Sequence, residues 1–227
     1  MQKMTVIAIT IASAFGLAGL LAAPAPSTAQ AAKEHPILDE RTVLHDPDVP
    51  VLGNPKGDVT IVEFFDYQCP YCRKMHPDLM RLVAEDGKIR LVLKDWPILT
   101  EHSRTAARLA LAAKYQGRYA ETHAALMETS GRLDQDKIRA AAIKAGLDLG
   151  KVDADVKARG PEIDAVLART AAQADALKLT GTPALLVGPF KVPGLGYDDL
   201  KKVVAEAGRE RSTSRERKKV RKIKSRL

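Results

Sequence analysis

The chain has 227 residues, of which 45% are hydrophobic, and it carries a formal net charge of +8. This length allows one large domain or two small ones, and the composition excludes a wholly disordered protein, a collagen and a multi-span membrane protein. Two cysteines are too few for a disulfide-rich scaffold or a four-cysteine zinc site.

The N-terminus has the layout of a secretory signal, so residues 1–31 are predicted to be a cleaved signal peptide. Lys3 precedes an uncharged, mostly apolar run from Met4 to Leu21, and Ala29-Gln30-Ala31 fits the A-x-A cleavage pattern. The alternative is an uncleaved membrane anchor, because this run is close to the shortest that can span a bilayer. Both interpretations predict a periplasmic or otherwise extracytoplasmic location, where disulfides persist.

Residues 32–57 are polar and rich in proline and glycine, which predicts a leader segment on the domain surface. Val59–Phe65 is β-branched and aromatic and too short for a helix, which indicates a buried strand. The apolar spacing of residues 70–85 predicts a helix that ends at Gly87, and Ile89–Leu93 is typical of a second strand. This order predicts a βαβ unit with a parallel pair of strands.

An alanine-rich block from about 103 to 178 is predicted to be helical, with breaks at glycines. Its expected helices are 103–116, 117–129, 134–145, 151–158 and 161–178. Two short strands, 184–187 and 190–192, and a helix at 197–207 are expected to follow. The sequence thus predicts an α/β domain over 58–208, in which a helical subdomain is inserted between a βαβ half and a ββα half.

The positive charge is concentrated in the C-terminal segment 209–227, which holds ten Lys or Arg and two Glu. Because it has almost no apolar content, this basic tail is predicted to be disordered or a frayed helix. One interpretation is attraction to an anionic surface such as lipid, cell-wall polymer or nucleic acid, each basic residue contributing about 1 kcal/mol. The alternative is a solvated extension with no specific partner.

Both cysteines lie in one C-x-x-C motif, Cys69-Pro70-Tyr71-Cys72, directly after the first strand and at the start of a helix. The unpaired N–H groups and the dipole of the helix N-terminus stabilise a thiolate at Cys69. Pro70 suits the first helical position, where its missing N–H is not needed. A thiolate favours the reduced form, so the disulfide becomes a stronger oxidant. Cys72, one turn further in, is expected to be buried and to act as the resolving thiol.

Two other interpretations of the motif are weaker. A zinc site would need further ligands, and the nearest histidine is His76. A purely structural disulfide would close so short a loop that it would constrain little of the unfolded chain. Redox chemistry is therefore the favoured interpretation, with no metal and no cofactor.

The segment Phe64–Met75 resembles the active site of the DsbA-like thiol–disulfide oxidoreductases of the thioredoxin superfamily. Gly181-Thr182-Pro183-Ala184 resembles the loop that carries their cis-proline, and the helical block matches the insertion of that family. The resemblance covers about 50–208 and implies a thioredoxin fold.

The resemblance implies that Cys69 is the nucleophile and Cys72 the resolving thiol. It implies that Thr182 and Pro183 lie against the disulfide, with Pro183 in cis; the alternative is an ordinary trans proline. Glu63, on the strand that leads to the active site, would be a buried acid able to pass protons to the resolving thiol. The alternative is a solvated glutamate at the end of the strand.

Lys94, at the end of the second strand, is expected either to pair with Glu63 or to lie on the surface. Many oxidases of this family have histidine where Tyr71 stands, and tyrosine supplies no positive charge to a thiolate. Pro77 is expected to kink its helix, unless the helix breaks at Met75-His76. His76 is expected to be a surface or helix residue and not a catalyst.

Aromatic residues are only 4% of the chain. Three of them are expected to border the active site and line an apolar groove for unfolded substrate: Tyr67, Tyr71 and Trp96, with core packing as the alternative for Trp96. Pro70 and Thr182 join them as substrate-binding candidates. Three others are expected in the core: Tyr115, Tyr119 and Phe190.

These observations predict an exported, monomeric enzyme that introduces disulfides into unfolded or reduced exported proteins. A membrane redox partner of DsbB or DsbD type would restore its starting state. One alternative is an isomerase or reductase kept reduced by a membrane electron donor. Another, of a different class, is an envelope-surface interaction protein that acts through its basic tail.

Overall fold

The computed structural model describes residues 38–224, and the side chains of all of these except 219, 220, 223 and 224. The predicted signal peptide 1–31 lies outside the described residues. Within 38–224, no helix combines the length and the apolar character that a membrane span requires.

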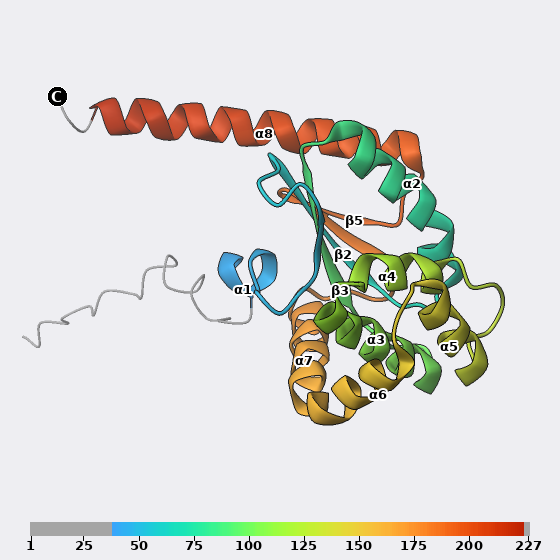
Figure 1. Ribbon diagram of the computed structural model, residues 1–227. Helices are drawn as coiled ribbons and strands as arrows, with labels where there is room; N and C mark the ends of the chain where they lie inside the picture. The colour runs from blue at the N-terminus through green and yellow to red at the C-terminus, as the bar shows by residue number, and fades with distance from the viewer. Residues whose placement is uncertain (1–37, 225–227) are drawn as a thin grey trace, which may run out of the picture. The chain divides into compact units, whose positions relative to one another are not determined.

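A five-stranded sheet forms the centre of the domain, in the order β1-β3-β2-β4-β5 (Figure 1). Its strands are β1 (Val51–Gly53), β2 (Val59–Phe65), β3 (Ile89–Asp95), β4 (Ala184–Val187) and β5 (Phe190–Pro193). The β2–β3 pair is parallel, and each of the other pairs is antiparallel. The predicted strands and the predicted parallel pair are therefore confirmed.

The register of β2 against β3 decides which side chains share a face of the sheet. Glu63 lies opposite Leu93, Phe64 opposite Lys94, and Phe65 opposite Asp95. Because side chains alternate along a strand, Glu63 and Asp95 share one face, and Lys94 points to the other.

Helix α2 (Pro70–Asp86) connects β2 to β3 and packs beside α8 (Tyr197–Lys224), as Figure 1 shows. It ends at Gly87, whose backbone has the left-handed φ of 66° that glycine adopts without strain. The helix continues through Pro77, so the alternative of a break at Met75-His76 is wrong. His76 is buried within this helix and not on the surface.

The helical subdomain is present where the alanine-rich block predicts it. It comprises α3 (Glu101–Ala113), a 3₁₀ turn (Lys114–Gln116), α4 (Tyr119–Met127), α5 (Gln135–Lys144), α6 (Leu149–Ala158) and α7 (Gly160–Ala176). Helix α3 lies at its centre and contacts α4, α5, α6 and α7. Its small alanines are buried there, which allows the helices to approach closely.

The expectation that residues 32–57 form a surface leader is wrong for the part that the structure describes. This segment contains α1 (Glu40–Leu44) and the edge strand β1, and it buries Val43 and Val49. Arg169 of α7 holds it through Asp46, at 3.0 Å. The segment is thus part of the domain, stabilised by long-range contacts that its proline-rich composition conceals.

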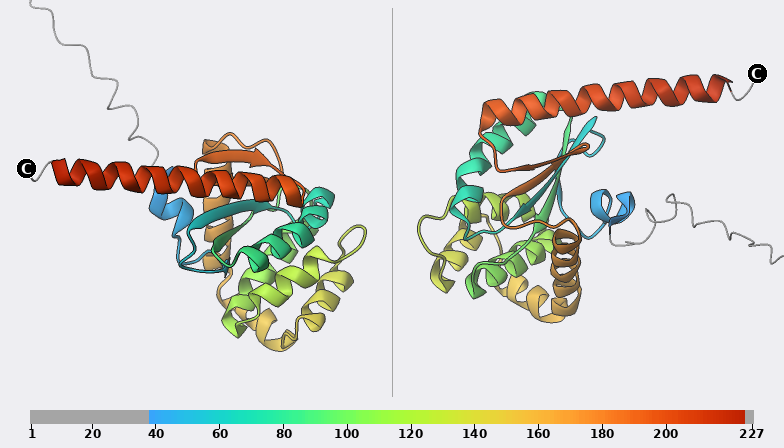
Figure 2. Two further views of the ribbon diagram at one scale, coloured as in Figure 1. Left: turned by 90° about the horizontal axis from the view of Figure 1, so that it is seen from above. Right: turned by 180° about the vertical axis from the view of Figure 1, so that it is seen from behind.

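The basic tail is helical and not disordered as far as Lys224. Figure 2 shows α8 as one continuous helix. Its first half buries Leu200, Val204 and Ala207 against the domain. That packed half provides the nucleus, so the following residues extend an existing helix and do not have to start one.

Candidate active site

The two cysteines lie at the N-terminus of α2, where β2 leads into the helix. Cys69 is the N-cap residue, and the backbone N–H of Cys72 donates to its sulfur at 3.5 Å. Pro70 occupies the first helical turn, as predicted. Both thiols are free, so this is the reduced dithiol, and both cysteines are largely removed from solvent.

The pKa of Cys69 is lowered to about 5. The largest cause is the hydrogen bond from the Cys72 thiol, which acts against the effect of burial. The side chain of Thr182 and the backbone N–H groups of Cys72 and Tyr71 lower it further. Cys69 is therefore a thiolate at neutral pH.

Cys72 behaves in the opposite way, because burial raises the pKa of its thiol far above the ordinary value. The hydrogen bond to Cys69 raises it further, and so does the charge of Glu63 when that carboxyl is ionised. The reduced pair therefore holds one anion, on Cys69, and one proton, on Cys72.

The loop before β4 closes over Cys69. The Thr182–Pro183 peptide bond is cis, as predicted, and the Cys69 sulfur lies 3.2 Å from the Thr182 carbonyl oxygen, to which it donates only when it is protonated. Gly194 lies directly against Pro183: a Cβ atom at Gly194 would be 2.5 Å from Pro183 Cγ. Glycine at 194 therefore permits the close approach of the two segments.

Glu63 is buried on the face of the sheet that carries Cys69 and Cys72, and neither of its oxygens has a hydrogen-bond partner among the described residues. Burial raises its pKa to about 8, helped by the charges of Asp95 and Cys69. The predicted buried acid is thus confirmed. The predicted pairing with Lys94 is wrong: Lys94 is buried on the opposite face, where its Nζ donates to the Thr42 carbonyl at 3.4 Å.

Asp66 organises the loop between β2 and α2, and sequence reasoning did not identify it. One oxygen accepts from the Gln68 N–H at 2.7 Å. The other accepts from the N–H groups of Ile98 and Leu99, at 2.8 and 2.9 Å. An aspartate directly after a buried strand is the only local signal for this role.

Two more side chains attach the α4–α5 loop to the start of α2. Arg73 donates to the carbonyls of Tyr67 and Gly131, at 2.7 and 2.6 Å. Gln68 accepts from the Leu133 N–H at 2.6 Å. Because Gly131 and Leu133 are about sixty residues away from Arg73 and Gln68 in the chain, the sequence offers no signal for these two contacts.

The predicted substrate-binding aromatics occupy different environments. Tyr71 is 71% exposed beside the cysteines, which suits a contact to substrate. Tyr67 is buried, and its hydroxyl bonds to Nδ1 of His123 at 3.1 Å, so the expectation that it lines a groove is wrong. Trp96 is partly buried and packs edge-on against Phe64.

Of the aromatics expected in the core, Tyr119 is buried and Phe190 packs against the core. Tyr115 is not in the core: it is 41% exposed, with the Arg159 guanidinium 4.2 Å above its ring.

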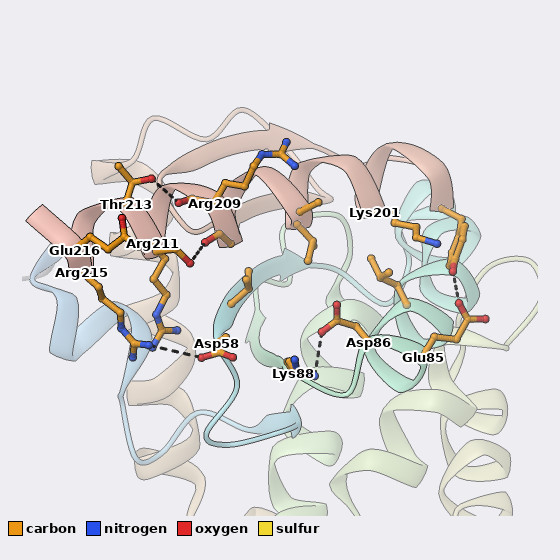
Figure 3. A pocket seen from close by; sticks show the side chains of 17 residues that line it. Asp58, Glu85, Asp86, Lys88, Lys201, Arg209, Arg211, Thr213, Arg215 and Glu216 are labelled. Carbon is orange, nitrogen blue, oxygen red and sulfur yellow. Dashed lines mark hydrogen bonds and ion pairs between the residues drawn. The ribbon is translucent and has the colours of Figure 1, made fainter.

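Two hollows flank the C-x-x-C motif. One, of about 250 Å³, is lined by Tyr71, Lys74, Met75, Asp78 and residues 194–196. The other, of about 620 Å³, is lined by Gln68, Pro70, Arg73, Lys74 and residues 127–132. A third, of about 920 Å³, lies between α8 and the C-terminal end of α2, and no cysteine lines it (Figure 3).

Within residues 38–224, no three His, Cys, Asp or Glu side chains gather in a way that could hold a metal ion. The chemistry available at this site is that of the two sulfurs and the buried carboxyls beneath them.

Comparison with known proteins agrees with this geometry. A family model described as thioredoxin matches residues 45–206. A thioredoxin-like oxidoreductase from Silicibacter pomeroyi is 44% identical, with a TM-score of 0.71 over 74% of this chain and 97% of that one. The thiol-disulfide exchange protein alpha-DsbA2 from Wolbachia pipientis is 28% identical, with a TM-score of 0.69 over 73% of this chain and 90% of that one. The fold is therefore the predicted thioredoxin fold with a helical insertion.

The chain also matches part of a larger protein. It is 31% identical over 140 residues to the Na(+)/H(+) antiporter NhaA 1 of Mycolicibacterium gilvum. The matched region covers 60% of this chain and 23% of the antiporter. The chain thus spans about a quarter of the length of the antiporters it matches.

The thiolate absorbance of the reduced protein is expected to titrate with a midpoint near pH 5. Cys69→Ser should remove this step, and Cys72→Ala should move it to higher pH because it deletes the strongest stabilising hydrogen bond. An ultraviolet pH titration of the three proteins measures this. A wild-type midpoint near the ordinary thiol value of about 8.5 would contradict the proposed thiolate site.

Gly194→Ala is expected to slow thiol–disulfide exchange by roughly tenfold or more, because its Cβ displaces Pro183 from Cys69. The rate of reaction with a model disulfide, measured beside circular dichroism, tests this. Gly196→Ala is the matched control, since a Cβ there has no neighbour within contact distance. Equal rates for the two variants would show that the close approach at Gly194 does not matter.

Proposed function

Because the chain belongs to the thioredoxin superfamily and is one of its DsbA-like thiol–disulfide oxidoreductases, we propose that it introduces disulfides into exported protein substrates. The observation that carries this proposal is the contrast between the two thiols. The pKa of Cys69 is lowered to about 5, and that of Cys72 is raised by burial. A stabilised thiolate favours the reduced dithiol, and so makes the disulfide a strong oxidant.

The oxidised enzyme would react through Cys69. A substrate thiolate attacks the Cys69 sulfur, the Cys69–Cys72 bond breaks, and Cys72 leaves with the electron pair and takes up a proton. The second substrate thiolate then attacks the substrate sulfur of the mixed disulfide. The substrate leaves with a new disulfide, and Cys69 is released as the stabilised thiolate.

The surfaces beside Cys69 support protein substrates. Tyr71 is exposed next to the cysteines, and the loop of Thr182 and Pro183 passes within hydrogen-bond distance of the Cys69 sulfur. An extended substrate segment that pairs with the backbone before Pro183 would place its sulfur against Cys69. Trp96 borders this region in sequence, and its contact with substrate remains a prediction.

We propose export by the N-terminal signal, cleavage after residue 31, and action as a monomer in the periplasm or its equivalent. A membrane partner of DsbB type would then reoxidise the enzyme. The second candidate, an isomerase or reductase kept reduced by a DsbD-type donor, uses the same cysteines with the opposite electron flow. The low pKa of Cys69 favours the oxidase.

The oxidised wild type should oxidise a reduced, unfolded protein such as ribonuclease. One substrate disulfide should form for each enzyme disulfide that is consumed. Cys69→Ser should lower this rate at least a hundredfold, because no nucleophile or mixed disulfide remains. Given a substrate that already contains a disulfide, Cys72→Ser should attack it through Cys69, release one substrate thiolate and accumulate the mixed disulfide, because no resolving thiol remains. Mass spectrometry and thiol counting measure both.

The reverse pattern would favour the second candidate. Catalysed reduction of insulin disulfides by the reduced enzyme, with no oxidation of ribonuclease, would overturn the oxidase proposal. Full activity of Cys69→Ser would overturn both.

We further propose that the basic extension of α8 contacts anionic surfaces, specifically anionic lipid. Residues 209–224 hold nine Lys or Arg and two Glu, and the family match ends at residue 206. Arg211 donates to the Gly57 carbonyl of the domain at 3.4 Å. Arg215 lies 4.0 Å from Asp58 (Figure 3). Exposed contacts of this kind contribute little, so the basic side chains can exchange partners at little cost.

Binding to phosphatidylglycerol vesicles should weaken on the order of a hundredfold when Arg217, Lys218 and Arg221 are replaced by Gln, since each basic residue contributes about 1 kcal/mol. The matched control replaces three exposed lysines outside the tail: Lys56, Lys151 and Lys157. Co-sedimentation at two salt concentrations measures binding. Equal binding by both triple variants, or release of the protein from vesicles by equimolar DNA, would contradict a lipid role for the extension.

A further inference from the structure

Beneath the two cysteines, a second buried carboxyl lies near Glu63. The register of β2 and β3 puts Glu63 and Asp95 on one face of neighbouring strands, and both side chains are buried. The charge of Asp95 acts on Glu63 as the largest effect after burial. The site therefore holds two carboxyls where the sequence predicted one.

The two carboxyls have unequal partners. The Tyr119 hydroxyl of α4 donates to Oδ2 of Asp95 at 3.0 Å. Asp95 Oδ1 and both oxygens of Glu63 have no partner among the described residues. A donated hydrogen bond stabilises a carboxylate, and a buried carboxyl without one favours its protonated form. Between the two, Asp95 is the better place for the negative charge and Glu63 for the proton.

The surrounding groups supply little charge to change this assignment. Those that face the pair from the adjoining elements are Cys69, Cys72, Tyr67, Tyr119, His123 and Lys114. Burial keeps His123 neutral by lowering its pKa, and His76, beside it at 4.9 Å between ring centroids, is shifted the same way. Burial raises the pKa of Asp95 to about 7, which is below that of Glu63. The hydrogen bond from Tyr119 and the charge of Lys114, which donates to the Asp48 carbonyl, lower it and favour an ionised Asp95.

We propose that Asp95, held by Tyr119, is a positioning residue that keeps the proton on Glu63, so that Glu63 can protonate Cys72 as it leaves the disulfide. This rests on the proposed oxidase function. In that step the substrate sulfur bonds to Cys69, the Cys69–Cys72 bond breaks, and the electron pair goes to Cys72. The proton moves from Glu63 to the Cys72 sulfur, and water then reprotonates Glu63.

The pH dependence follows from the sign of the interaction. Burial, and after it the negative charge of Asp95, raises the pKa of Glu63 to about 8 in the reduced protein. The Cys69 thiolate also raises this pKa, and the disulfide form lacks it. The rate at which substrate thiolate opens the enzyme disulfide should therefore fall as Glu63 loses its proton, at a pH somewhat below 8. Removal of the Asp95 charge should move this fall to lower pH.

Asp95→Asn is expected to shift the falling limb of the rate profile by about one pH unit or more to lower pH. Tyr119→Phe should shift it in the same direction but less, because Asp95 then loses its donor and takes up the proton itself. Stopped-flow rates of the oxidised proteins with a small thiol, corrected for thiol ionisation, give these profiles. The matched control is Asp136→Asn, an exposed aspartate of α5.

A second readout observes Glu63 directly. The infrared carbonyl band of its protonated carboxyl is identified by its loss in Glu63→Gln. In the reduced wild type this band should titrate near pH 8, and in reduced Asp95→Asn it should titrate at a lower pH. An unchanged band and an unchanged falling limb in a folded Asp95→Asn protein would overturn the proposal. If the small thiol did not react with the wild-type disulfide at the Cys69 sulfur, the proposed function would be overturned instead. The infrared titration would still decide the role of Asp95.

Discussion

The negative charge on the Cys69 sulfur is the feature on which the rest of the site depends. It is stabilised first by the Cys72 thiol, and then by Thr182 and the N–H groups that open α2. The N–H groups are available because β2 ends one loop before the helix begins, which leaves the first turn unpaired beside the sulfur, whereas Thr182 comes from the loop before β4. The same burial that weakens solvation of Cys69 keeps the proton on Cys72. One folded junction thus creates both the anion and its unreactive partner.

The surrounding fold holds this junction in place from three directions. Asp66 and Arg73 attach the loop before α2 to residues 98–99 and to Gly131. Gly194 lets Pro183 approach the sulfurs from β4, where a larger residue would clash. Glu63 of β2 and Asp95 of β3 lie on one face of the sheet near the cysteines. The site therefore combines a sulfur pair that exchanges electrons with a carboxyl pair that can hold a proton. Both pairs are asymmetric because burial and hydrogen bonds act unequally on their two members.

Local sequence signals predicted the features that depend on local structure. The C-x-x-C motif after an apolar strand placed Cys69 at a helix N-terminus, and glycine breaks placed the helices of the insertion. What the sequence could not supply was register and long-range contact. Lys94 was considered as a partner of Glu63, but a parallel register turns it to the other face. Tyr67 is predicted to line a substrate groove beside the active site, but it is buried and its hydroxyl bonds to His123 of α4. Composition was also misleading at two places: β1 lies in a proline-rich segment, and the charged tail continues the helix whose first half, directly before it in the sequence, packs against the domain.

The reduction potential of the Cys69–Cys72 pair, measured by equilibration with glutathione, tests the central claim most directly. A thiolate stabilised as strongly as that of Cys69 makes the disulfide oxidising, so a potential close to that of the strong oxidant DsbA, about −120 mV, is expected. The Cys72 hydrogen bond that stabilises the Cys69 thiolate should also make the disulfide oxidising. A rise of the thiolate midpoint in Cys72→Ala and an oxidising potential in the wild type are therefore expected together. A potential near that of thioredoxin, about −270 mV, would contradict the oxidase and favour a reductase supplied with electrons from the membrane.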